Sequence, residues 1–317
     1  MELSIVIPVY NEEENLEPLI RETTRALAPS GKSYEIIVVD DGSNDKSYAI
    51  LTRLHGTETR LKVVRLRRNF GQTAAVAAGL AHAQGEVIVA MDGDGQNDPG
   101  DIPALLARLD EGFDLVSGWR FPRQDPFWSR RLPSSIANAL ISWMTQVKLH
   151  DYGCTLKAIR RDTAKDLKLY GEMHRFIPAI AYERGARIAE IKVHHRPRHG
   201  GKSKYGLART FRVVLDLLTV KFLLSYGTRP LHIFGLLGLL SGVVGLLLAV
   251  FLTAQKLFYG VDIGARPLLL LAVLLIVISF QFVTMGLLGE MIVRTYHESQ
   301  DKPIYAIKEI LEARRTA

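Results

Sequence analysis

Two carboxylates separated by one residue, Asp92 and Asp94, are the side chains of this sequence best suited to chemistry. Glycines at positions 93 and 95 let the backbone turn sharply and come close to a ligand. Carboxylate oxygens suit Mg²⁺ and Mn²⁺, and Mg²⁺ usually shares its coordination shell between one or two carboxylates and the phosphates of a substrate. The spacing therefore predicts a divalent cation bound together with a phosphate ester.

The Asp-Gly-Asp-Gly run has two alternative interpretations, a surface turn and an EF-hand loop. Asp and Gly also cluster in ordinary surface turns, so the four residues alone do not decide between a turn and a metal site. An EF-hand loop starting at Asp92 would need glycine at its sixth position and glutamate at its twelfth, where this chain has Asn97 and Pro103. The EF-hand is excluded, and the surrounding elements favour the metal site over the turn.

The elements that would position these carboxylates are those of an α/β protein. Val87 to Ala90 is apolar throughout and leads directly into Asp92, as expected of a strand buried on both faces. Further strands are predicted at 3–9, 34–39 and 62–66, the first apolar and the second buried. Intervening helices are predicted at 16–27, 47–54 and 72–84, the first capped by Asn11. This alternation predicts a mainly parallel sheet with helices on both faces and ligands at the carboxyl ends of its strands.

Polar residues follow the strands at those carboxyl ends. Tyr10 and Glu12 follow the first strand, and Asp40 and Asp41 the second. A dinucleotide-binding domain would carry Gly-x-Gly-x-x-Gly in its first turn, where this chain reads Pro-Val-Tyr-Asn-Glu, so NAD binding is not expected. Asp40 has a second interpretation, in which it only stabilises the turn before Gly42.

Several runs resemble the family 2 glycosyltransferases with a GT-A fold: Val6-Ile-Pro-Val-Tyr-Asn-Glu12, Val38-Val-Asp-Asp-Gly-Ser43, Asn69-Phe-Gly-Gln72 and Asp92-x-Asp-x-Gln96. The chain is most similar to the polyprenyl-phosphate glycosyltransferases, such as dolichol-phosphate mannose synthase, bactoprenol glucosyltransferase and undecaprenyl-phosphate aminoarabinose transferase. Three runs carry that closer similarity: Asp151-Tyr-Gly-Cys-Thr-Leu156, Arg198-x-x-Gly-x-Ser-Lys-Tyr205 and Gly286-Leu-Leu-Gly-Glu290. The family often reads Asp-Ala-Asp-Leu-Gln where this chain has Gly93 and Gly95.

The resemblance implies an inverting transfer of a sugar from a UDP- or GDP-sugar to a polyprenyl phosphate, for cell-envelope glycan or lipid modification. It implies that Asp92, Asp94 and Gln96 hold Mg²⁺ or Mn²⁺. The residues expected to bind the nucleotide-sugar are Pro8, Tyr10, Glu12, Asp40, Asp41, Asp92, Arg198, Ser203 and Lys204. Asp94, Arg120 and Asp151 are the expected catalytic residues, although Asp151 could instead brace the loop at Gly153.

Basic residues gather after position 118. As a group they suit a lipid phosphate, because guanidinium groups bind phosphate through two parallel hydrogen bonds. The resemblance implies that the acceptor phosphate binds at Arg120, at Ser134 and at Arg130 or its neighbour Arg131. A run of arginines can also be a solvated face. The adjacent His194 and His195 would point to opposite sides of a strand, so one at most is expected to serve the site.

Two uncharged, mostly apolar runs, 233–255 and 267–289, are each long enough to cross a bilayer. The predicted plan is a GT-A domain at 1–206, amphipathic juxtamembrane helices at 207–229, two transmembrane helices within 230–293 (about 231–257 and 267–292) and a tail at 294–317. The N-terminus lacks a signal-peptide pattern, and the tail is basic. A multi-pass protein of the inner membrane is therefore expected, with its catalytic domain and tail in the cytoplasm.

The net charge of +7 fits anionic lipid headgroups, and no nucleic-acid-binding module is recognisable. The single cysteine, Cys154, excludes an intrachain disulfide. Gly238-x-x-x-Gly242 could pack the two spans together or join subunits. The resemblance, which implies a homo-oligomer (a tetramer), favours the second.

Two other functions share these features. A processive polysaccharide synthase would carry a Gln-x-x-Arg-Trp motif, and no Arg-Trp pair occurs in the chain. An inactive membrane scaffold that binds sugar nucleotides is the other alternative, against which the intact acidic positions argue.

Overall fold

The computed structural model describes residues 1–121, 141–142, 145, 147–169, 173–196, 231–260, 262–264, 266–299 and 304–313. Contacts divide the chain into two compact units, Met1–Leu217 with Pro303–Ala317, and Leu218–Lys302. The described residues of the first unit contain an eight-stranded sheet. Its strands, in spatial order, are β7 (Ile188–Val193), β5 (Leu115–Arg120), β6 (Lys157–Arg160), β4 (Val87–Ala90), β1 (Leu3–Val9), β2 (Tyr34–Asp40), β3 (Leu61–Leu66) and β8 (Ile307–Leu311).

The centre of the sheet is parallel, as predicted. Strands β4, β1, β2 and β3 pair in parallel, with Leu3 opposite both Tyr34 and Val87. Every residue of β2 is buried, because helices cover both faces of the sheet. Two antiparallel strands, β6 beside β4 and β8 beside β3, make the sheet mixed rather than wholly parallel.

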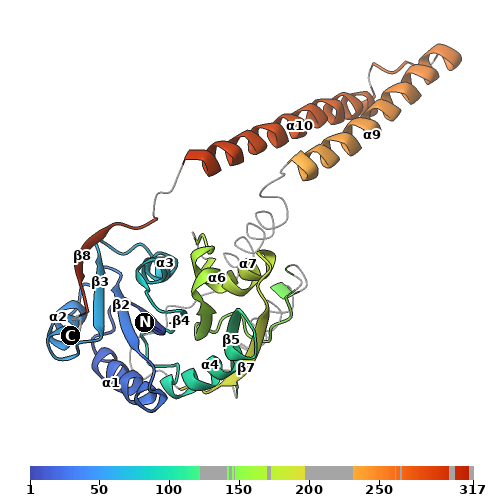
Figure 1. The fold of residues 1–317 in the computed structure, drawn as a ribbon. Coiled ribbons are helices and arrows are strands. Elements are labelled where there is room, and N and C mark those ends of the chain that lie inside the picture. Colours follow the sequence, from blue (N-terminus) through green and yellow to red (C-terminus); the bar gives the residue numbers. More distant parts are fainter. Residues whose placement is uncertain are drawn as a thin grey trace. The chain divides into compact units, whose positions relative to one another are not determined.

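Helices cover the sheet in two layers (Figure 1). One face carries α1 (Leu16–Leu27) and α4 (Ile102–Asp110), with α2 (Ser47–Thr57) packed beside α1. The other face carries α3 (Gln72–His82), α6 (Arg161–Lys165) and α7 (Ile177–Glu183). These bounds agree with the predicted helices to within three residues where a prediction was made.

Helix α3 lies very close to strand β1. A Cβ atom added at Gly79 would lie 2.2 Å from Cγ1 of Val6, which is too short for any real contact. On the opposite face, Ile5 and Ile7 of β1 pack with Leu16 and Ile20 of α1 in the main core. Both faces of β1 are therefore packed against helices. This packing holds in place the strand that leads into the predicted nucleotide-binding residues.

The predicted cap of α1 at Asn11 is wrong. The helix begins at Leu16, preceded by Asn15 as its cap position. Asn11 has a φ of 57°, in the left-handed region, and its side-chain oxygen accepts the backbone N–H of Asn44. Its side chain thus ties the loop after β1 to the loop after β2, a contact between segments that the local pattern does not reveal.

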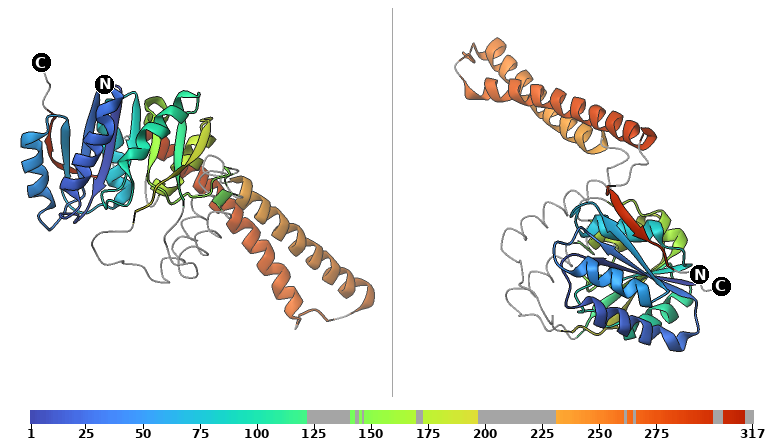
Figure 2. Two further views of the ribbon diagram at one scale, coloured as in Figure 1. Left: turned by 90° about the horizontal axis from the view of Figure 1, so that it is seen from below. Right: turned by 90° about the vertical axis from the view of Figure 1, so that its left-hand side faces the viewer.

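Strand β8 comes from the segment that the sequence assigned to a C-terminal tail. Val63 of β3 lies opposite Leu311, and the two strands run side by side in Figure 2. The Lys62 ammonium, almost fully buried, lies 3.0 Å from a carboxylate oxygen of Glu312. The Tyr48 hydroxyl donates to Glu309 at 2.6 Å. The chain beyond the second apolar helix therefore returns to complete the edge of the eight-stranded sheet.

The second unit is a hairpin of two long helices, α9 (Leu231–Tyr259) and α10 (Pro267–Ser299), which pack along each other (Figure 1). The segments Phe234–Tyr259 and Pro267–Gly289 are long and apolar enough to cross a membrane. Large apolar side chains are exposed along both helices, among them Leu247, Leu270 and Phe280. Such a surface is stable only against lipid or another apolar surface.

The glycines of α9 face α10 within the same chain. A Cβ atom at Gly238 would lie 2.9 Å from Cγ2 of Val283, and one at Gly242 would lie 2.6 Å from Oγ of Ser279. Gly245 is equally close to the backbone carbonyl of Ala272, at 3.0 Å. The glycine face therefore packs the two helices together, which corrects the preference for a contact between subunits.

Candidate active site at the carboxyl end of the sheet

The loop after β4 carries the paired carboxylates, and its two glycines have different roles. A Cβ atom at Gly93 would lie 2.9 Å from Cγ2 of Val9 and 3.0 Å from the carbonyl oxygen of Pro8, so the loop crosses closely over the end of β1. Gly95 has a φ of 72°, which glycine adopts without strain. The N–H of Gln96 then donates to Oδ1 of Asp94 at 3.1 Å. The two glycines therefore allow a compact loop that packs against the end of β1.

Asp92 is held from several sides. The side-chain amide of Gln72 donates to its Oδ1 at 2.7 Å, and its own N–H donates to Oδ1 of Asn97 at 3.3 Å. Thr155 donates to the same oxygen of the buried Asn97 at 3.1 Å. Burial, and then the nearby carboxylate of Asp94, raise the pKa of Asp92 to about 6.

These side chains fit a divalent cation. A cation bound beside Asp92 would relieve the repulsion that its buried carboxylate feels from Asp94. Among the described residues no group of three or more His, Cys, Asp or Glu side chains could hold a metal. Two carboxylates and the amide oxygen of Gln96 suit an ion such as Mg²⁺, which keeps the rest of its shell for water and substrate phosphates. The donor set therefore favours a cation shared with a phosphate ligand.

Asp40 and Asp41 both stabilise loops. Oδ1 of the fully buried Asp40 accepts the N–H of Ser43 at 3.0 Å, the turn-stabilising role left open for it. Asp41 accepts the N–H groups of Phe70 and Gly71, at 2.7 and 2.9 Å. Burial raises the pKa of Asp41, and these two hydrogen bonds oppose the shift. Asp41 thus joins the end of β2 to the loop before α3, and Gln72, the first residue of α3, holds Asp92.

The residues predicted to bind the nucleotide after β1 lie at the same edge. Pro8 is opposite Val39 and, like Asp92, lines a small cavity described below. Tyr10 and Glu12 are partly exposed. The N–H of Glu12 donates to Oγ of Ser47 at 3.0 Å, so α2 holds this loop in place. The sheet therefore brings the predicted residues of β1, β2 and β4 together.

Arg120 and Asp151 form an ion pair at the end of β5. Nε and Nη2 of Arg120 donate to Oδ2 and Oδ1 of Asp151, at 2.7 and 2.9 Å. Oδ1 also accepts the N–H of Gly153 at 3.1 Å, as the bracing interpretation of Asp151 expected. The positive charge of Arg120 partly opposes the rise in the pKa of Asp92. The ion pair therefore lies close to the loop of residues 92–98, which we call the metal loop.

A small cavity of about 20 Å³ lies beneath the metal loop, large enough for about one water molecule. It is lined by Pro8, Gln72, Val76, Ala90, Met91, Asp92, Thr155, Lys157, His174 and Ile177. Lys157 is fully buried and donates to the carbonyl oxygen of Cys154, and burial lowers its pKa. Lys157 was not predicted from the sequence as part of the site. It belongs to β6, which pairs with β4, the strand before Asp92, so only the pairing of these strands brings it to the site.

The two histidines after β7 differ. His194 donates its N–H to Asp101 at 2.7 Å and its Nδ1 lies 2.8 Å from the same carboxylate, so it serves the structure. His195 forms a backbone bridge with Asn97 of the metal loop. Of the residues predicted to bind the nucleotide-sugar or the acceptor phosphate, six lie outside the described part of the chain: Arg130, Arg131, Ser134, Arg198, Ser203 and Lys204.

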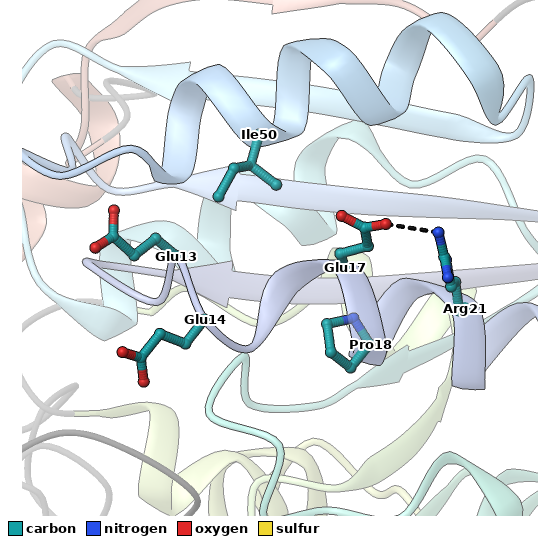
Figure 3. Close-up of a pocket in the computed structure, with 6 residues that line it drawn as sticks. All are labelled: Glu13, Glu14, Glu17, Pro18, Arg21 and Ile50. Carbon is teal, nitrogen blue, oxygen red and sulfur yellow. Dashed lines mark hydrogen bonds and ion pairs between the residues drawn. The ribbon is translucent and has the colours of Figure 1, made fainter.

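A larger groove of about 420 Å³ lies elsewhere, between the start of α1 and α2 (Figure 3). It is lined by Glu13, Glu14, Glu17, Pro18, Arg21 and Ile50. Glu17 and Arg21 pair with each other at 2.6 Å. Its remaining carboxylates would repel a nucleotide diphosphate, so the groove does not suit the donor.

Comparison with known proteins agrees with this geometry. A model of glycosyl transferase family 2 matches residues 4–168. The chain is 46% identical over 316 residues to a dodecaprenyl-phosphate galacturonate synthase of Rhizobium johnstonii, covering 98% of this chain and 94% of that protein.

Solved structures share the fold of the catalytic unit. Glucosyl-3-phosphoglycerate synthase from Mycobacterium tuberculosis in complex with Mn²⁺ and UDP-glucose matches 69% of this chain and 78% of its own, with a TM-score of 0.55 at 20% identity. The same enzyme with Mn²⁺, UDP and glucosyl-3-phosphoglycerate matches 69% and 79%, with a TM-score of 0.54 at 22% identity. The predicted GT-A class of fold is confirmed.

Proposed function

Because the chain belongs to glycosyl transferase family 2, we propose that it transfers a sugar from a nucleotide-sugar to the phosphate of a polyprenyl phosphate. The strongest support in the structure is the meeting of Asp92, Asp94 and Gln96 in one tight loop, with Arg120 nearby. The name of the 46% identical relative, a dodecaprenyl-phosphate galacturonate synthase, supports the class of acceptor. It also makes a nucleotide-linked galacturonate the first donor to test.

In this proposal Asp92, Asp94 and Gln96 hold Mg²⁺ or Mn²⁺ against the diphosphate of the donor. The cation would offset the charge of the diphosphate and of the leaving nucleotide. Pro8, Tyr10 and Glu12 lie at the same edge of the sheet and would hold the nucleotide. Asp41 would contribute indirectly, since its two oxygens already hold the loop of Phe70 and Gly71.

The acceptor needs little activation. The second pKa of a phosphate monoester is about 6, so a polyprenyl phosphate is already largely anionic at neutral pH. The main obstacle is the repulsion between two anionic substrates, which Arg120 would reduce together with Arg130, Arg131 and Ser134. Asp151 would hold Arg120 in place rather than remove a proton. Attack from the side opposite the nucleotide would invert the anomeric carbon.

The hairpin of α9 and α10 would anchor the enzyme in the membrane that contains its acceptor. Both helices are long and apolar enough to span it, and their packed glycine face leaves bulky apolar side chains outside. We propose the predicted plan of 1–206, 207–229, 230–293 and 294–317, in which the last segment supplies β8 to the sheet of the first unit, with both ends in the cytoplasm and the hairpin in the inner membrane. A homo-oligomer is part of the same proposal.

The test is to incubate the purified full-length protein with dodecaprenyl or undecaprenyl phosphate, Mg²⁺ or Mn²⁺, and a panel of UDP- and GDP-sugars, and to identify glycolipids by mass spectrometry. We expect one sugar per lipid, released nucleoside diphosphate, and loss of product with EDTA. Asp94→Asn should abolish transfer, whereas Asp110→Asn, an exposed change on α4, should not.

Three results would overturn the proposal. Binding of a nucleotide-sugar without any glycolipid product would indicate an inactive scaffold. Products with more than one sugar would indicate a processive synthase. Full activity of Asp94→Asn would remove the assigned role of the carboxylate pair.

A further inference from the structure

Arg196, the last described residue after β7, contacts two separate elements through its guanidinium group. Nη1 lies 2.6 Å from Oε2 of Glu22 on α1, and Nη2 lies 2.8 Å from Oδ2 of Asp98 at the end of the metal loop. Neither contact was expected from the sequence, because the three residues are far apart along the chain. Together they join helix α1, the metal loop and the end of β7.

The backbone of Arg196 reinforces these contacts. Its N–H donates to the carbonyl oxygen of Gln96 at 2.9 Å, and the side-chain amide of Gln96 donates to the carbonyl oxygen of Arg196 at 3.4 Å. One residue earlier, His195 forms a bridge with Asn97. Gln96 and Asn97 are therefore paired with Arg196 and His195 in antiparallel order.

The metal loop is thus held from two sides. Toward the core, Asn97 accepts from Asp92 and Thr155, and Gln72 donates to Asp92. On the other side, the backbone of Arg196 holds Gln96, and its guanidinium group ties Asp98 to Glu22. The first set positions one predicted metal ligand, Asp92, and the second set positions another, Gln96.

We propose that Arg196 is a positioning residue for the donor, which holds Gln96 and the end of the metal loop in the geometry that binds the metal–nucleotide complex. This inference rests on the proposed function and adds a residue that lies outside the motif runs quoted above. Arg196 also neutralises Glu22 and Asp98, two carboxylates that would otherwise repel an anionic diphosphate bound at the adjacent loop. Both effects act on donor binding and neither acts on the lipid.

A purely structural role would give a different result. The side chains of Arg196, Glu22 and Asp98 are 35%, 41% and 26% exposed, and ion pairs at this exposure contribute little to the free energy of unfolding. Loss of a residue that orients a metal ligand, in contrast, typically weakens metal binding by about 10- to 100-fold. The proposal therefore predicts a binding defect without a matching stability defect.

The experiment uses the full-length protein in detergent, with isothermal titration calorimetry of UDP and of GDP in the presence of MnCl₂. Arg196→Met should weaken binding of the nucleotide that wild type binds by at least about tenfold, and Arg196→Lys should restore part of it. In turnover the KM for the donor should rise while the KM for the polyprenyl phosphate stays unchanged. The melting temperature should stay close to that of wild type.

Arg187→Met is the matched control. Arg187 immediately precedes β7 at its opposite end and pairs with Asp114 at 3.5 Å, with its side chain 68% exposed. This variant should bind the nucleotide as wild type does. Asp98→Asn removes the same contact together with one repelling carboxylate, so it should reproduce part of the defect of Arg196→Met, and the double variant should be no worse than Arg196→Met alone.

The outcomes separate the two proposals. If wild type binds neither UDP nor GDP with Mn²⁺, the proposed function itself is overturned. If wild type binds and Arg196→Met binds equally well, the positioning role is overturned. A weaker affinity that is matched by an equal loss in Arg187→Met, or that is explained by a lower melting temperature in both Arg196 variants, overturns it as well.

Discussion

Arg120 and Asp151 are joined by two parallel hydrogen bonds, Nε to Oδ2 at 2.7 Å and Nη2 to Oδ1 at 2.9 Å. The Asp151 side chain is 1% exposed and that of Arg120 17%. Because both oxygens of Asp151 accept hydrogen bonds from the guanidinium group, this carboxylate is poorly placed to accept a proton from a substrate. The pair instead fixes the direction of a guanidinium group beside the metal loop.

Removing one charge of this pair should cost more than removing both. Asp151→Asn leaves the charge of Arg120 partly buried and uncompensated, so we expect a loss of about 3 kcal/mol of stability. The double variant Arg120→Met/Asp151→Asn should regain at least half of that loss, because both charges are then absent. Thermal unfolding in detergent measures both; strictly additive losses would contradict the coupling.

Metal binding should weaken at acidic pH. The folded-state pKa of Asp92 is about 6, above its ordinary value of 3.8, because of burial and the charge of Asp94. A cation must displace the proton, so the apparent Kd for Mn²⁺ should rise about tenfold for each pH unit below 6 and stay constant above 7. Calorimetric titrations of Mn²⁺ between pH 5 and 8 measure this. A flat profile would show that Asp92 is already ionised at pH 5.

The same shift has a consequence for the metal-free protein. Since the folded state holds the proton more tightly than the unfolded chain, the contribution of Asp92 to stability is present below pH 4 and is lost as the pH rises from about 4 to about 6. With EDTA present, Asp92→Asn should therefore show a higher stability than wild type at pH 7, measured by thermal unfolding. Equal stabilities at pH 7 would argue against the raised pKa.

Bulk added to the glycine face of α9 should separate the two long helices. The side chain of Gly242→Ile would collide with Ser279 of α10, and overpacking of this kind costs about 1–3 kcal/mol. Leu239→Ile, on the exposed side of the same helix, is the control and should change little. Thermal unfolding and size-exclusion chromatography distinguish the outcomes. A change of oligomeric state at unchanged stability would mean that the glycines join subunits after all.

Deletion of residues 304–317 should destabilise the catalytic unit, although these residues come after both apolar helices. It would remove β8, expose the edge of β3 and leave the ammonium of Lys62 buried without Glu312. We expect a loss of about 2 kcal/mol, which corresponds to about 4–8 °C in melting temperature, together with a greater tendency to aggregate. An unchanged melting temperature would mean that β8 adds nothing to the sheet.

The amino-acid sequence alone determined the central sheet and the position of its site. Leu3–Val9 and Tyr34–Asp40 are mostly apolar, as expected of strands whose two faces are covered, and such runs can be recognised without knowing the neighbours. The carboxyl ends of parallel strands lie at one edge, so Asp92 and Asp94 could be placed there as well. The class of fold was predicted correctly on this basis, and the family and the class of enzyme were predicted correctly from the resemblance of the motif runs.

Only the tertiary structure decided which of these residues pair with one another. Asp151 with Arg120, Lys62 with Glu312, and Arg196 with Glu22 and Asp98 each join segments that are distant along the chain. A residue's type and local spacing indicate whether it is buried and in what kind of element. Which charge it meets depends on where the folded backbone brings the other segments, and a pattern within a single segment carries no information about that.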